Sequence, residues 1–287
     1  MEAIQYARPS TIDDAVRRLS EAGARVLAGG TDLLVQMRGG ALRPRLIVDI
    51  KGIAELRRVE STPQGFRVGA AVAGAELGAH AAFAEQWPGV VEAFELIGST
   101  QVQGRASLGG NLCNASPAAD SVPALIAAGA RCTIAGPQGR REMAVEEVCV
   151  GPGKTALAPG EFIVDFFFAT PPARTGDAYL RFIPRTEMDI AVVGAAVCLT
   201  LDAGGRCTAA RVALGAVAPR ALLVPAAADA LIGTTVDDAA LARLAAAASA
   251  ACQPIDDKRG TIEFRTRVAG VLARRAAVAA LARARGQ

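Results

Sequence analysis

A polar, glycine-rich segment inside an otherwise apolar chain is the feature that most constrains this fold. Residues 107–120 read SLGGNLCNASPAAD and carry two asparagines, two serines and an aspartate, whereas hydrophobic residues make up 52% of the whole chain. The segment has neither a strand period nor a helix period, so it predicts an ordered loop or a set of turns. Burying its polar groups unpaired would cost about 1–3 kcal/mol each, and a polar ligand is one way to pair them.

A second glycine pair lies at residues 28–32, which read AGGTD and directly follow a predicted strand. A glycine pair lets the backbone reach positive φ and lets amide N–H groups crowd an anion without a Cβ in the way. Thr31, Ser107 and Asn111 add side-chain hydrogen-bonding groups beside the two pairs. Together the two loops can cradle a pyrophosphate. Each pair alone is also typical of a tight turn, and neither matches the GxGxxG or P-loop pattern.

The charge and apolar patterns exclude several kinds of partner. The chain has 31 basic and 28 acidic residues, a balance that argues against nucleic acid as the main partner. Its longest uncharged runs, such as residues 190–201, are shorter than the roughly 20 apolar residues of a membrane span. The start, MEAIQYARPS, shows no secretory pattern. We therefore expect a cytoplasmic protein with no membrane span.

The cysteines and the histidine argue against metal and nucleophilic chemistry in this chain. Cysteines stand at positions 113, 132, 149, 198, 207 and 252 with no CxxC pair, and His80 is the one histidine. We therefore predict no metal site, neither zinc nor an iron–sulfur cluster, within this chain. One histidine also leaves little room for Ser-His-Asp or Cys-His catalysis, so we predict no catalytic residues of that kind.

Hydrophobic periodicity predicts an alternation of helices and strands. The predicted strands cover residues 25–28, 46–50, 66–72, 131–136 and 161–168, and the predicted helices cover 11–23, 75–99 (broken at Pro88-Gly89) and 121–130. Residues 171–177, PPARTGD, are the best linker candidate. Beyond them, runs at 179–183, 190–202 and 207–217 predict an antiparallel meander, followed by alanine-rich helices from residue 226.

Three stretches of the sequence resemble one known family. They are AGGTDLL at 28–34, IGSTQVQGRASLGGNLCNASPAAD at 97–120 and YLRFIPRTEMDIAVVGAAVCLTLD at 179–202. Together they resemble the FAD-binding subunit of the molybdenum hydroxylases, a family that includes xanthine dehydrogenases and aerobic carbon monoxide dehydrogenases. The resemblance implies an α+β fold. A vanillyl-alcohol-oxidase-like FAD-binding domain, residues 1–172 with subdomains of about 1–55 and 56–172, precedes an α+β C-terminal domain, residues 177–287, with an antiparallel sheet.

The resemblance also implies which residues contact FAD. They are Val26, Leu27, Ala28, Gly29, Gly30, Thr31, Asp32, Ile97, Gly98, Ser107, Gly109, Gly110, Asn111, Asp120, Ile163 and Arg181. The family often has Lys in place of Arg181, which keeps the charge but changes the donor geometry. Xanthine dehydrogenases tend to carry an acidic pair where this chain has Met188-Asp189. That difference argues against NAD as the electron acceptor.

In the family, this subunit works inside a larger complex. The resemblance implies a molybdopterin-binding large subunit, a small subunit with two [2Fe-2S] clusters, and a dimer of heterotrimers. Electrons from the substrate pass through the clusters to FAD and on to NAD, a quinone or another acceptor. The substrate, which the large subunit selects, is CO, a purine, an N-heterocycle or an aldehyde. The alternatives are a stand-alone FAD-dependent oxidoreductase of the same fold and an interaction protein without cofactor.

Overall fold

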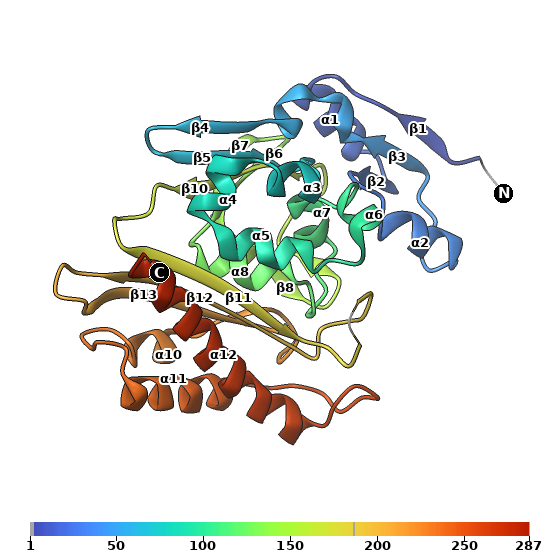
Figure 1. Ribbon diagram of the computed structural model, residues 1–287. Helices are drawn as coiled ribbons and strands as arrows, with labels where there is room; N and C mark the ends of the chain where they lie inside the picture. Colours follow the sequence, from blue (N-terminus) through green and yellow to red (C-terminus); the bar gives the residue numbers. More distant parts are fainter. Residues whose placement is uncertain (1–2, 186, 287) are drawn as a thin grey trace.

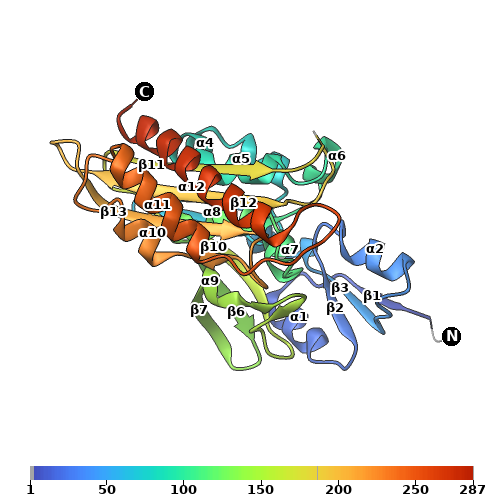
Figure 2. The same cartoon turned by 90° about the horizontal axis from the view of Figure 1, so that it is seen from below.

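Three main β-sheets follow one another along the chain in the computed structural model, which describes residues 3–185 and 187–286 (Figure 1), beside one two-stranded hairpin. The first sheet is small and parallel, and the second and third are larger and antiparallel. Helices lie between the second and third sheets and on the outer face of the third sheet (Figures 1 and 2). No helix among the described residues is long and apolar enough to cross a membrane.

The first sheet has the strand order β1 (Gln5–Ala7), β3 (Leu46–Asp49), β2 (Ala24–Leu27). Helix α1 (Ile12–Leu19) connects β1 to β2, and α2 (Leu33–Arg38) follows β2. The predicted helix start at Thr11 is confirmed, because its Oγ1 accepts the N–H of Asp14 at 3.2 Å. Strand β1 was not predicted, since three residues are too few to show a period. Two short 3-10 helices, η1 (Ile50–Gly52) and η2 (Ala54–Arg57), lead to the second sheet.

The second sheet has the order β4 (Val59–Thr62), β5 (Gly65–Gly69), β10 (Phe162–Ala169), β6 (Arg131–Gly136), β7 (Gly139–Ala144). The strand predicted over 161–168 is confirmed as β10, which is central and almost entirely buried. On one face Phe83 packs edge-on against Phe66 and Phe168, with ring centroids 5.4 and 5.1 Å apart. This aromatic group anchors the helices on the sheet.

Several short helices lie along the chain between β5 and β10. They are α3 (Gly74–Gly78), α4 (Ala81–Gln86), α5 (Pro88–Glu95), α6 (Thr100–Gln103), α7 (Leu108–Cys113), α8 (Ser121–Ala127) and α9 (Val145–Val148), and a hairpin of β8 (Cys149–Gly151) and β9 (Lys154–Thr155) follows. The predicted break at Pro88 is confirmed, because Pro88 begins α5. His80 caps α4, and its Nδ1 accepts the N–H of Phe83 at 3.3 Å.

The third sheet is the predicted meander, with strands β11 (Thr175–Phe182), β12 (Val193–Leu201), β13 (Cys207–Gly215) and β14 (Leu222–Leu223) in sequence order. Helices α10 (Pro225–Asp229), α11 (Asp238–Ala250) and α12 (Ile262–Ala284) cover its outer face (Figure 2). The inner face contacts α5 and α8. On the outer face, small residues allow α12 to pack closely on the sheet, since a Cβ on Gly176 would overlap the backbone of α12.

The predicted linker at 171–177 is too long, because β11 already begins at Thr175. The buried core of the second sheet also includes Tyr179, Ala196 and Ala213 from the third. The two halves therefore share packed side chains beyond the short linker. The division into domains 1–172 and 177–287 stays a prediction.

Candidate functional site

An open cleft of about 440 Å³ lies where the first sheet meets the second. It brings together the end of β2, the loop after it, α7 and the start of β10. Most of the predicted cofactor-binding residues line it, namely Val26, Ala28, Gly29, Gly30, Thr31, Asp32, Ile97, Ser107, Gly109, Gly110, Asn111 and Ile163. Segments far apart in sequence thus form one concave surface, as a bound cofactor requires.

The first glycine loop packs directly against the chain that leads into α7. A Cβ on Gly29 would overlap the carbonyl oxygen of Arg105, so only glycine permits this approach. Gly30 has a φ of +81°, a conformation that side-chain-bearing residues rarely adopt. Among the described residues, the amide N–H groups of Gly29, Gly30 and Thr31 have no hydrogen-bond partner. They remain available to an anionic ligand.

The second glycine pair lies in a helix, so the prediction of a segment without regular structure over 107–120 is wrong for residues 108–113, which form α7. Ser107 is the N-cap, and its Oγ accepts the N–H of Gly110 at 3.2 Å. Leu108 and Leu112 are fully buried. Their packing outweighs the low helix propensity of the glycine pair, which is why sequence alone did not predict this helix.

Gly109 and Gly110 have different surroundings. A Cβ on Gly109 would lie 2.7 Å from the carbonyl oxygen of Ala70, so the packing of the protein itself requires glycine there. A Cβ on Gly110 would meet only the Oγ of Ser107, at 3.3 Å. Packing therefore does not require glycine at position 110, whereas a ligand lying against the cleft wall would. A side-chain-free position in the cleft that also holds the unpaired amides of the first loop fits the needs of a diphosphate group.

Asn111 is oriented by the start of α8. Its Oδ1 accepts the hydroxyl of Ser121 at 2.7 Å and the Ser121 N–H at 3.3 Å. The side-chain oxygen of Asn111 is thus occupied, and its Nδ2 group remains as a hydrogen-bond donor in the cleft lining.

A polar bridge that the sequence did not predict joins the two loops. The Nδ2 of Asn114 donates to Oδ1 of Asp32 at 3.1 Å, and the Nε2 of Gln36 donates to Oδ1 of Asn114 at 3.0 Å. Burial raises the pKa of Asp32. No local pattern signals this bridge, because Asp32 and Asn114 are 82 residues apart.

Four predicted residues do not line the cleft: Leu27, Gly98, Asp120 and Arg181. Asp120 and Arg181 instead form a buried ion pair at 2.9 Å, and the hydroxyl of Tyr179 donates to Asp120 at 2.9 Å. Arg181 also donates to the carbonyl of Leu96, directly before Ile97, at 2.8 Å. Burial raises the pKa of Asp120 to about 6, against the opposing effects of Arg181 and Tyr179. The ion pair links the third sheet to the wall of the cleft.

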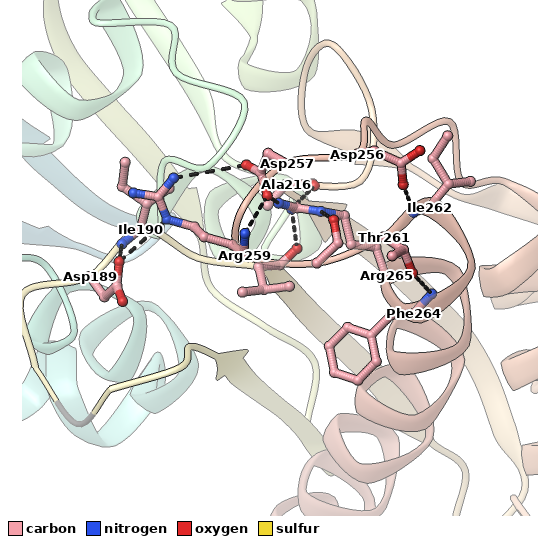
Figure 3. Close-up of polar contacts among 12 residues, drawn as sticks. Asp189, Ile190, Ala216, Asp256, Asp257, Arg259, Thr261, Ile262, Phe264 and Arg265 are labelled. Carbon is pink, nitrogen blue, oxygen red and sulfur yellow. Dashed lines mark hydrogen bonds and ion pairs between the residues drawn. The ribbon is translucent and has the colours of Figure 1, made fainter.

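Asp189 also lies outside the cleft lining. Its carboxylate accepts from Arg185 at 3.2 Å, within the β11–β12 connection. It also accepts from Arg259 at 3.4 Å, which ties this connection to the segment before α12 (Figure 3). In the same close-up, the buried Arg265 donates to Asp257 at 2.7 Å. The backbone N–H of Ile190, followed by the two arginines, lowers the pKa of Asp189. The negative charge at this position is thus largely neutralised by its own neighbours.

Other lining residues were not predicted. Leu42, Ile50, Leu157 and Phe162 give the cleft an apolar wall, and Arg25, Gln36 and Cys113 also line it. We expected Cys113, inside the second glycine segment, to be a small buried residue, but it is exposed. Within the described residues, no group of three or more His, Cys, Asp or Glu side chains is placed to hold a metal ion.

The cleft has the backbone N–H donors of a glycine loop on one side and an apolar wall on the other. In an α+β protein, such a cleft is typical of a site for a nucleotide cofactor. A family model described as the FAD binding domain in molybdopterin dehydrogenase matches residues 2–170, and one described as the CO dehydrogenase flavoprotein C-terminal domain matches residues 178–280. The chain belongs to this family of FAD-binding subunits of molybdopterin dehydrogenases. The predicted resemblance and fold class are confirmed.

Individual relatives agree with this assignment. The chain is 34% identical to the carbon monoxide dehydrogenase medium chain of Afipia carboxidovorans, over 99% of this chain and 98% of that one. It is 34% identical to the xanthine dehydrogenase FAD-binding subunit of Escherichia coli O157:H7, over 75% and 74% of the two chains. Among solved structures, a Cu,Mo-CO dehydrogenase chain superposes with a TM-score of 0.94 at 34% identity, covering 98% of both chains. Quinoline 2-oxidoreductase from Pseudomonas putida 86 gives 0.91 at 28%, also over 98% of both.

Proposed function

We propose that this chain is the electron-relay subunit of a heterotrimeric molybdenum hydroxylase. It accepts electrons from the [2Fe-2S] clusters of a small partner subunit and passes them from FAD to an external acceptor. A molybdopterin-binding large subunit oxidises the substrate, and two heterotrimers form the complete enzyme. The similarity of the whole chain to medium chains named for carbon monoxide and nicotine supports this assembly. A cytoplasmic location stays a prediction.

Within this proposal, the diphosphate of FAD lies between the first glycine loop and α7. When bound, FAD supplies an isoalloxazine ring that exchanges electrons between one-electron and two-electron carriers. The amides of Gly29, Gly30 and Thr31 and the Nδ2 of Asn111 hold the diphosphate. Ile163 is buried in β10 and lines the same cleft, so it supplies an apolar surface that excludes water. The observation that carries the proposal is that Gly110, where a Cβ would meet only the Ser107 Oγ, lines the same cleft as the unpaired amides of Gly29, Gly30 and Thr31.

The proposal is tested by the colour and the partners of the purified chain. We expect an absorption band near ~450 nm and one FAD per chain. Co-expression with its genomic neighbours should yield a complex that contains molybdenum and iron. A colourless chain would overturn the FAD site. A yellow chain that never assembles with molybdenum- and iron-bearing subunits would overturn the relay role and favour the stand-alone oxidoreductase.

A further inference from the structure

Lys51 lies at the edge of the first sheet, beside the first glycine loop. Strands β2 and β3 are parallel neighbours in which Leu27 pairs with Asp49, so their carboxyl ends lie together. The end of β2 continues into the glycine loop. The end of β3 continues into Ile50, which lines the cleft, and then into Lys51.

The Lys51 ammonium group makes two short contacts. Its Nζ donates to the carbonyl oxygen of Ala28 at 2.6 Å and to Oδ1 of Asp49 at 2.6 Å. The Lys51 side chain is 22% exposed and that of Asp49 is 8% exposed. This arrangement is a largely desolvated, charge-assisted hydrogen bond to the first peptide group of the glycine loop.

Asp49 is itself held in place from the other side. Its Oδ2 accepts the hydroxyl of Tyr6, in β1, at 2.7 Å, and its Oδ1 also accepts the backbone N–H of Lys51 at 3.0 Å. Burial raises the pKa of Asp49, but the hydrogen bonds from Lys51 and Tyr6 outweigh this effect and lower it. Asp49 therefore stays ionised at neutral pH and holds the lysine.

Because the peptide bond is planar, this contact also fixes the direction of an N–H group in the cleft. In a trans peptide, the carbonyl of one residue and the N–H of the next point in opposite directions. When Lys51 binds the carbonyl of Ala28, the N–H of Gly29 must point away from Lys51. That N–H has no partner among the described residues, and Gly29 lines the cleft.

We propose that Lys51, held by Asp49 and Tyr6, is a positioning residue that fixes the Gly29 N–H toward the diphosphate of the cofactor. The inference rests on the proposed function, since it assigns a role at the same FAD site. Lys51 binds protein atoms only. It acts on the ligand through the peptide that it orients, and its charge also favours an anion in the adjacent loop.

The experiment measures FAD affinity and stability of the cofactor-free protein in parallel. We expect Lys51→Met to raise the FAD dissociation constant about tenfold or more, and Lys51→Arg to restore it to within about threefold. The cofactor-free Lys51→Met protein should melt at a lower temperature, because the buried Asp49 loses its charged partner, but it should stay folded at the temperature of the titration. Lys258→Met removes one lysine charge from the segment before α12 and is the matched control. Its FAD dissociation constant should equal that of the wild type.

The possible results distinguish a failure of the positioning role from a failure of the proposed function. Wild-type FAD affinity in Lys51→Met would overturn the positioning role. A second result would also overturn it: a loss of FAD affinity that accompanies a collapse in melting temperature and that Lys51→Arg does not restore. That pattern is expected of a contact that only supports the fold. A wild-type protein that fails to bind FAD in the same titration would instead overturn the proposed function.

Discussion

Gly29 lies so close to the carbonyl group of Arg105 that no Cβ fits between them. This contact holds the first glycine loop against the entrance to α7, and it sets the width of the cleft between them. Gly29 is thus needed by the packing of the protein, whereas a Cβ on Gly110 would meet only the Oγ of Ser107, at 3.3 Å. Substitution of Gly29 should therefore affect the fold and the site, and substitution of Gly110 should affect ligand binding.

Substituting Gly29 should damage the fold as well as the site. In Gly29→Ala the new methyl group must push the loop away from Arg105, and we expect a destabilisation of about 1–3 kcal/mol. The purified variant should also lack FAD. Urea unfolding and the flavin-to-protein ratio measure both effects. Wild-type stability would contradict the close contact.

Substituting Gly110 should affect the ligand alone. Alanine favours a helix over glycine by up to about 1 kcal/mol, which offsets the tight contact with the Ser107 Oγ, so Gly110→Ala should fold about as well as the wild type. We expect this variant to lose most of its FAD, and Gly110→Val to lose all of it, because the side chain occupies the space of the phosphates. The flavin-to-protein ratio is the measurement. Stoichiometric FAD in Gly110→Val would show that the diphosphate lies elsewhere.

The buried pair of Asp120 and Arg181 should contribute strongly to stability. Arg181→Met leaves the Asp120 carboxylate buried with only the Tyr179 hydroxyl, and we expect a loss of about 3–5 kcal/mol. Arg181→Lys keeps the charge and should cost less. The exposed pair of Arg17 and Asp14 gives the control, since Arg17→Met should cost about 1 kcal/mol or less. An equal loss of stability in Arg181→Met and Arg17→Met would contradict a strong contribution from the buried pair.

Asp177 should make the stability of the protein depend on pH. Burial raises its pKa to about 7, although the backbone N–H of Gly89 and the charge of Arg283 oppose the shift. Between the unfolded pKa of about 3.9 and the folded pKa, the folded state holds a proton that the unfolded chain has released. Stability should therefore fall as the pH rises through this range, and level off above it.

The Asp177→Asn variant tests this dependence. Urea unfolding at about pH 5 and about pH 8 should show a smaller loss of stability in the variant than in the wild type. Some loss should persist, because burial also raises the pKa of Asp120 to about 6. Asp13→Asn, at an exposed position in α1, is the control. A variant with the wild-type pH dependence would show that Asp177 is ionised throughout.

Several elements could be predicted from the sequence because their causes are local. Thr11 caps α1, Pro88 starts α5, and the apolar run 162–169 forms the central strand of its sheet. The two glycine pairs likewise indicated two of the segments that line the cleft. Helix α7 was missed, because its glycines disfavour a helix and only the burial of Leu108 and Leu112 supports it.

The sequence by itself determined the family, the order of most strands and helices, and about half of the residues that line the cleft, since these follow from motifs of neighbouring residues. Only the tertiary structure decided that Arg105 packs on Gly29, that Asp120 pairs with Arg181 across 61 residues, and that Lys51 binds Ala28. The physical reason is that such contacts join segments whose separation in sequence carries no signal. They exist only once the sheets have packed and water has been excluded from between them.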